Sequence, residues 1–230
     1  MLTRPTPKQP TTSRPTIEAP VLTRLAGPHQ EGRQRLERCV AQVYERVHDA
    51  HIEHFHESLL GLEDRSGELL GVIGHTHPDA RPLFLEAYLE EPIEARMASR
   101  MGHGVPRSSL AEVGNLSALQ PGAATALVST LAQVLDQRGV RYAVFTATTA
   151  TRRVFGRLGA KITDLGQADG TRLGDALADW GSYYACQPRV AVMDIVDLCA
   201  RCEANPRLTR RLSALWAQAR ALQDQQRISA

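Results

Sequence analysis

The stretch AEVGNLSALQPGAATALVSTLAQVL, residues 111–135, constrains the fold more than any other part of the chain. Its apolar start predicts a β-strand over residues 110–117, and its later periodicity predicts a helix over residues 125–138. The smallest residues, Gly122, Ala123 and Ala124, stand where the strand meets the helix. Small residues there leave helix N-terminal N–H groups accessible to a phosphate, although they also suit a tightly packed turn. The unit predicts either packing or a site for a pyrophosphate or phosphopantetheine phosphate.

Strands and helices alternate on both sides of this unit. A helix is predicted over residues 33–50, and strands over 58–63 and 68–76 form a hairpin around a turn at 64–67. Residues 83–90 read as an extended entry to a helix that begins at Pro92, where a missing N–H is harmless. The later predicted elements are a strand at 142–147, a helix at 149–158, a strand at 161–165, a mixed segment at 171–185, a strand at 189–195 and exposed helices from 196. The alternation predicts an α/β fold with a mixed sheet covered by helices.

Three regions follow from this pattern. Residues 1–32 are rich in Pro, Thr and Arg and lack apolar periodicity, which predicts a flexible N-terminal arm. Residues 33–195 hold the sheet and its helices. Residues 196–230 form a C-terminal helical extension.

Composition excludes several classes of protein. The 230 residues carry a net charge of only +2, which does not favour nucleic acid as a partner. No run approaches the roughly 18 to 20 apolar residues of a membrane helix, and the N-terminal residues lack the apolar core of a secretory signal. The expected location is therefore cytoplasmic, without transmembrane insertion. Four irregularly spaced cysteines, one pair of them in a CxxC on a predicted helix, and scattered histidines do not make a convincing metal site.

Four pieces of the sequence have the order and spacing typical of one family. They are LFLEAYLEEPIE (83–94), AEVGNLSAL (111–119), VFTATTATRRVFGRLGAKITDLG (144–166) and ADWGSYYACQPRV (178–190). On these pieces the chain resembles the thermostable haemolysin family. That family is similar in architecture to GNAT acyltransferases and, more closely, to acyl-homoserine lactone synthases. The resemblance implies a GNAT-like central mixed β-sheet flanked by helices, and an N-acyltransferase activity.

The resemblance also implies roles for residues of the strand–loop–helix unit. Glu112 corresponds to the acidic residue on the central strand and is the expected general base, while Asn115 is expected to orient substrate if a bulge at Gly114 turns it toward the cleft. The alternatives are a carboxylate paired with an arginine and an amide that satisfies the bulge. The phosphate-binding loop is expected at Leu119, Gln120, Gly122, Ala123, Ala124 and Thr125.

Two features depart from the GNAT pattern. The central glycine of the loop comes one position early, and Pro121 removes one N–H donor. Phe155 stands where GNAT enzymes often carry a tyrosine that protonates the leaving thiolate, and phenylalanine has no proton to give. Either another group or water supplies that proton, or the transfer chemistry has been lost.

Further side chains are candidates for binding. Thr146 and Arg152 are expected beside the acyl donor, as a pantetheine contact and a phosphate contact. Glu86 and Glu90 share a face in an extended segment and suit a cationic amine, although a solvated acidic patch explains them equally well. Trp180 and Tyr184 fit either core packing or an acyl-chain pocket.

These observations leave three functions open. The first is transfer of an acyl group from acyl-CoA, or from the phosphopantetheine of an acyl carrier protein, to a small-molecule amine without a metal. The others are a membrane-active haemolysin and a non-catalytic module that binds an acyl carrier or a lipid. A homodimer is a further option.

Overall fold

A seven-stranded sheet forms the centre of the molecule, with strand order β1-β2-β3-β4-β5-β7-β6. The computed structural model describes residues 22–78 and 82–228. Its strands are β1 (Leu22–Ala26), β2 (Ser58–Glu63), β3 (Leu69–Thr76), β4 (Leu110–Ala118), β5 (Tyr142–Ala147), β6 (Ile162–Gln167) and β7 (Arg189–Asp194). Only β4 and β5 pair in parallel. The sheet is therefore mixed, and the α/β fold with a mixed sheet predicted from the sequence is confirmed.

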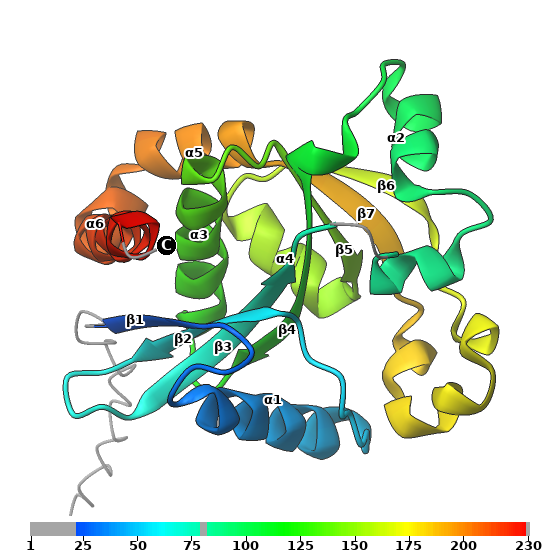
Figure 1. Ribbon diagram of the computed structural model, residues 1–230, viewed down its shortest axis with the longest axis horizontal. Coiled ribbons are helices and arrows are strands. Elements are labelled where there is room, and N and C mark those ends of the chain that lie inside the picture. Colours follow the sequence, from blue (N-terminus) through cyan, green and yellow to red (C-terminus); the bar gives the residue numbers. More distant parts are fainter. Residues whose placement is uncertain (1–21, 79–81, 229–230) are drawn as a thin grey trace, which may run out of the picture.

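Helices cover both faces of this sheet (Figure 1). The α-helices are α1 (Arg33–His48), α2 (Ile93–Met101), α3 (Ala123–Gln137), α4 (Thr149–Arg157), α5 (Ile195–Ala204) and α6 (Pro206–Ile228). The short 3-10 helices are η1 (Phe84–Tyr88), η2 (Arg107–Ser109), η3 (Gly170–Trp180) and η4 (Tyr183–Cys186). α1 packs on one face of the N-terminal strands and α3 on the other.

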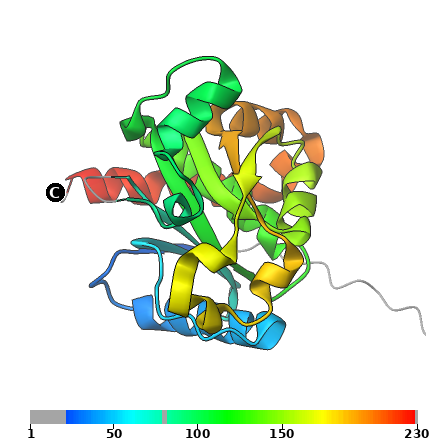
Figure 2. The ribbon, with the colours of Figure 1, turned by 90° about the vertical axis from the view of Figure 1, so that its right-hand side faces the viewer.

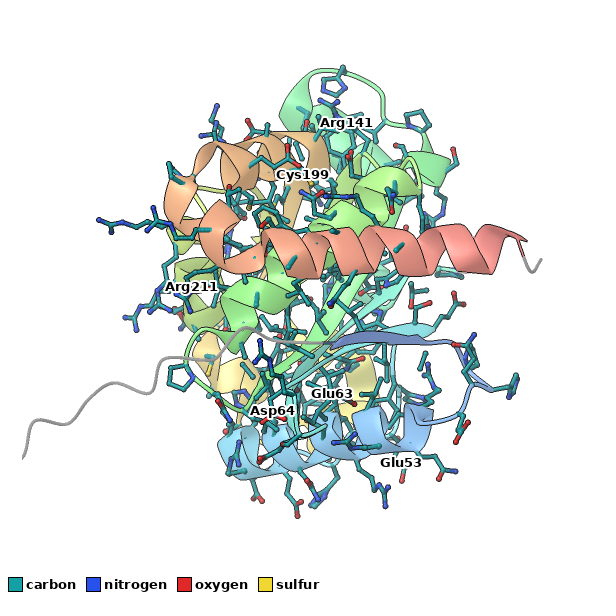
Figure 3. The ribbon with its side chains drawn as sticks, turned by 90° about the vertical axis from the view of Figure 1, so that its left-hand side faces the viewer. Glu53, Glu63, Asp64, Arg141, Cys199 and Arg211 are labelled. Atoms are coloured by element: carbon teal, nitrogen blue, oxygen red, sulfur yellow. The ribbon has the colours of Figure 1, made fainter. Side chains whose placement is uncertain are left out.

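The main core lies between the sheet and α3. Apolar residues from β2 to β7 meet α3 there, and α5 and α6 contribute Cys202, Leu212 and Trp216. Trp216 is 2% exposed, and its indole N–H donates a hydrogen bond to Ser129 of α3 at 3.2 Å. Figure 3 shows α6 crossing this side of the molecule, with Cys199 of α5 labelled above it. The C-terminal helices, predicted to be exposed, thus bury large apolar side chains against α3.

The parallel strands β4 and β5 separate partway along their length. Their pairing runs from Leu110 with Tyr142 to Val113 with Phe145, and no pair follows it among the described residues. β4 nevertheless continues to Ala118. A gap therefore opens between the strands beyond Val113, on the side where α3 and α4 begin.

A bulge in β4 accompanies this separation. The register between β3 and β4 shifts between Val72 and Gly74, which pair with Ser117 and Gly114. Asn115 in the bulge has φ 51°, a left-handed conformation that asparagine tolerates better than most residues. The bulge therefore begins at Asn115, one residue after the expected position Gly114, and changes the direction of the Asn115 side chain.

Two sequence-based expectations are wrong in detail. Residues 22–26, inside the expected arm, form edge strand β1, which pairs with β2. Residues 27–32 form turns before α1, and residues 1–21 lie outside the described residues. Residues 83–90 are not extended, because Phe84–Tyr88 forms η1. The boundaries at 32/33 and 195/196 stay predictions. Within the described part of the chain, no helix is both long and apolar enough to cross a membrane.

Candidate active site

A pocket of about 520 Å³ passes through the gap between β4 and β5. One wall comes from α1 and the segment 54–57, another from η1, Trp180 and Tyr183, and the far end from Ala124 and the start of α4. Figure 2 shows the η3–η4 segment in yellow beside α1. Its position there is fixed by hydrogen bonds from the Ser182 N–H to the His48 carbonyl and from the His51 N–H to the Asp179 carbonyl, both 2.7 Å.

Glu112 lies in the wall of this pocket, just before the strands part. Its side chain is buried, and its two oxygens accept hydrogen bonds from the N–H groups of Phe84 (2.8 Å) and Leu85 (3.0 Å). Burial raises the pKa of Glu112 to about 7, and the two N–H donors oppose that rise. The carboxyl therefore exchanges a proton near neutral pH, as a general base must. No arginine in the described part of the chain forms an ion pair with it, which was the structural alternative.

The expected phosphate loop meets the pocket at fewer positions than predicted. Gly122 is the N-cap of α3 with φ 90°, so the helix begins at Ala123, two residues earlier than expected. Ala124 lines the pocket, whereas Ala123 is fully buried in the core. Leu119 and Gln120 are exposed and, with Gly122 and Thr125, lie outside the pocket lining. The Ala123 N–H donates to the Gln120 carbonyl at 3.2 Å, but no side chain caps α3, so the N–H groups of Ala124 and Thr125 suit an anion.

The end of β5 and the start of α4 form the adjoining wall. Thr146 and Thr148 both line the pocket. Thr148 also caps α4, since its hydroxyl accepts a hydrogen bond from the Thr151 N–H at 3.3 Å. Arg152 lies outside the lining and pairs with Asp164 at 3.2 Å, beside Arg189. Of the two predicted contacts, Thr146 lies at the pocket, whereas Arg152 forms an ion pair outside it.

Asn115 and His56 form a linked pair in the pocket wall. The Asn115 amide oxygen accepts a hydrogen bond from the His56 N–H at 2.9 Å, which is the bulge-satisfying role given above as the alternative. The His56 ring lies 3.0 Å from the Thr76 hydroxyl, and desolvation lowers its pKa to about 4. The imidazole is therefore neutral at pH 7. Its place beside the catalytic candidate was not predicted, because it depends on the pairing of β3 with β4.

Glu86 and Glu90 do not share the pocket wall with Glu112. Glu86 binds Arg107 at 2.7 Å and accepts hydrogen bonds from the N–H groups of Leu83 and Ile93. Burial opposes ionisation of Glu86, but these partners outweigh it and lower its pKa to about 2. Glu90 is 78% exposed and pairs with Arg172. Both carboxylates therefore form ion pairs within the chain, and neither lines the pocket.

Aromatic side chains form much of the pocket wall around Glu112. Phe84, Tyr88, Trp180, Tyr183 and Tyr44 all line it. The Phe84 and Trp180 ring centroids are 5.4 Å apart, and those of Phe84 and Tyr88 are 5.9 Å apart. Trp180 is therefore in the pocket as predicted, whereas Tyr184 lies behind it, with its hydroxyl bonded to that of Tyr88.

Phe155 lies at the opposite side of the pocket. It is 2% exposed, lines the pocket and packs on Phe145 with ring centroids 4.6 Å apart. Tyr44 and Tyr88 line the pocket elsewhere, and the Tyr88 hydroxyl is bonded to that of Tyr184. Burial raises the pKa of both, to about 12 for Tyr44, so both keep their protons at neutral pH.

The CxxC pair belongs to the core. Cys199 and Cys202 are buried on α5, and desolvation raises their pKa values to about 12 and about 11. Thiols in that state are poor nucleophiles and metal ligands. Within the described residues, no group of three or more His, Cys, Asp or Glu side chains is arranged to hold a metal ion.

The fold places the chain in a structural class that it shares with acyl-homoserine lactone synthases and an N-acyl amino acid synthase. TofI in an apo form aligns with a TM-score of 0.53 at 16% identity, over 82% of this chain and 99% of that one. FeeM, an N-acyl amino acid synthase from uncultured soil microbes, aligns with a TM-score of 0.53 at 16% identity, over 79% and 99%. The AHL synthase LasI aligns with a TM-score of 0.51 at 11% identity, over 83% and 93%.

Within this class, the chain belongs to the thermostable hemolysin family, whose model matches residues 26–199. The family resemblance seen in the sequence is thereby confirmed. No curated protein matches the sequence.

Proposed function

We propose that this chain is an N-acyltransferase that moves an acyl group from acyl-CoA or an acyl carrier protein to the amine of a small molecule. The product is an N-acylated, lipid-like or signal-like amide, formed in the cytoplasm. The observation that carries this proposal is the position of Glu112. Its carboxyl is largely buried, has a pKa of about 7 and lines a pocket where two parallel strands part.

Glu112 acts as the base in this reaction. The amine nitrogen attacks the thioester carbonyl carbon, the new C–N bond forms, and the C–S bond breaks. The Glu112 carboxylate takes the proton that the nitrogen loses. The leaving thiolate takes a proton from solvent or from a tyrosine hydroxyl in the pocket, since Phe155 has none to give.

The donor lies along the gap between β4 and β5. The uncapped N-terminus of α3 suits the phosphate of phosphopantetheine, next to Ala124. Thr146 and Thr148 offer hydroxyls to the pantetheine amides. Apolar side chains such as Val43, Phe55 and Val154 are available to the acyl chain.

Thiol release tests this proposal. Purified full-length protein is incubated with acyl-CoA and acyl-carrier thioesters of several chain lengths, with and without a panel of amines. Release of free thiol that requires amine, together with the N-acyl product in the mass spectrum, is expected. Thiol release at the same rate without amine would indicate a hydrolase and contradict the proposal.

A second candidate function is a module that holds an acyl carrier or a lipid without turnover. The buried Phe155 in the pocket wall favours it, because the expected proton donor is missing at that position. Thermal stabilisation by an acyl thioester, with no amide formed from any amine, would support the module over the enzyme.

A further inference from the structure

We infer that the acceptor is a cationic amine without a carboxylate, bound as its ammonium form between Glu112 and the aromatic side chains Phe84, Tyr88 and Trp180. The inference rests on the proposed function and names the substrate class of the same pocket. It concerns a monoamine, a diamine or a decarboxylated amino acid rather than an amino acid.

The charges in the pocket wall are the first argument. Among the described residues that line the pocket, the carboxyl groups are Glu57 and Glu112, and there is no lysine or arginine. Three histidines also line the pocket: His54 is exposed, whereas desolvation lowers the pKa of His48 and His56, to about 4 for His56, and so disfavours a positive charge on them. An ammonium group therefore meets complementary charge in this pocket, whereas a carboxylate meets none.

The aromatic side chains are the second argument. The negative faces of indole, phenol and benzene rings attract a desolvated cation. Phe84, Tyr88 and Trp180 stand in ring contact, Tyr88 is 5% exposed, and all three line the pocket. Such a wall binds an ammonium and repels a carboxylate, whose charge has the opposite sign.

Glu112 and the aromatic wall belong to one place in the pocket. The Phe84 N–H donates to the Glu112 carboxylate at 2.8 Å, so the residue that carries one ring also holds the base. Tyr88 is close enough that the charge of Glu112 raises its pKa. The ammonium bound by the rings is thus the group whose proton Glu112 removes, and the free amine forms next to the thioester.

A carboxylate on the same carbon would lie within the same few ångströms. It would face the Glu112 carboxylate and the ring faces, with no described cation to pair with it. Like charges brought together in an interface typically oppose binding strongly. The pocket therefore discriminates between an amino acid and its decarboxylated counterpart.

Matched amine pairs test the inference. Full-length protein and the acyl-CoA donor of highest turnover are combined with lysine or cadaverine, arginine or agmatine, and tyrosine or tyramine. Each decarboxylated member should be acylated with a kcat/KM about a hundredfold above that of its amino acid. The methyl ester of tyrosine, which keeps the bulk but masks the charge, should recover most of the difference.

Variants of Trp180 test the aromatic wall. Trp180→Leu should raise the KM for the amine between about threefold and thirtyfold, whereas Trp180→Phe, which keeps a ring face, should change it less. The KM for acyl-CoA serves as the internal control and should stay constant in both. A rise of both KM values together would mean that Trp180 only supports the pocket.

The outcomes separate the inference from the proposed function. Amino acids acylated as fast as their decarboxylated partners would overturn the inference and leave the acyltransferase intact. Thioester binding with no thiol release from any amine would instead overturn the proposed function, and the inference with it.

Discussion

Replacing Glu112 by glutamine separates a catalytic base from a structural carboxyl. The side chain keeps its size but can no longer accept a proton, so turnover should fall by roughly two to four powers of ten at neutral pH. The loss should shrink below pH 7, where the wild-type carboxyl is itself protonated. It should also shrink at high pH, where the amine is already free and needs no base.

The same variant makes a separate prediction for stability. The pKa of Glu112 rises from an ordinary 4.5 to about 7 in the folded protein. Between these values the folded state binds more protons than the unfolded state, so wild-type stability falls as pH rises through this window. Relative to Glu112→Gln, the wild type should lose about 2 to 3 kcal/mol of unfolding free energy between pH 5 and pH 8.

The two backbone contacts of Glu112 add a second contribution to the stability difference between wild type and Glu112→Gln, and this contribution does not depend on pH. Glutamine accepts from only one of the Phe84 and Leu85 N–H groups and faces the other with its NH₂. That leaves a buried donor unsatisfied and costs about 1 to 3 kcal/mol at every pH. The pH-dependent difference is therefore the diagnostic quantity, and the absolute stability of the variant is not.

Urea unfolding at several pH values and amine-dependent thiol release are the assays. Glu86→Gln is the matched control, because the pKa of Glu86 is lowered to about 2 and it is ionised in both states from pH 5 to pH 8. Its stability difference from wild type should be nearly flat in that range. Wild-type turnover by Glu112→Gln, or a flat stability difference for it, would refute the reasoning.

Three further predictions concern the rest of the molecule. Ala124→Glu, which puts a carboxylate at the half-buried helix start, should abolish stabilisation by coenzyme A, whereas Leu119→Glu at the exposed neighbouring position should not; calorimetry with and without ligand measures both. Trp216→Ala should lower the unfolding free energy by about 3 to 5 kcal/mol, as measured by urea denaturation, and a loss under 1 kcal/mol would place α6 outside the core. In thiol titration of the native protein, Cys186 should react first and the three buried cysteines only on unfolding; fast reaction at Cys199 would contradict its burial.

Most strands and helices were predictable because each has a strong local pattern. β2 and β5 have the predicted ends, since apolar residues bounded by turn residues specify them without help from elsewhere. The structure of segment 83–90 was not predictable, because its 3-10 helix depends on residues distant in the sequence. Glu86 is held by Arg107, and the Glu112 carboxylate binds the N–H groups at the start of η1. No pattern within the segment contains that information.

The candidate site was predictable to the level of its central residue. The family resemblance and the place of Glu112 on a strand before a small-residue loop singled it out, and the structure has it in the pocket lining; its role as a base stays a prediction. The sequence did not distinguish Ala123 from Ala124, because the left-handed Gly122 starts the helix two residues early and thereby sets which alanine enters the pocket. His56 was also missed, since only the β4 bulge brings Asn115 to its N–H.

The part of the chain that folds together is larger than the part that the family model recognises. The match ends at residue 199, inside α5, whereas Trp216 of α6 is buried against Ser129 in the middle of α3. A protein cut at the end of the match would leave the outer side of α3 as an apolar surface in water, which favours aggregation. Expression of the recognised region alone would therefore report on solubility rather than on chemistry. Any homologue that lacks α6 must cover α3 with another segment or with a second subunit.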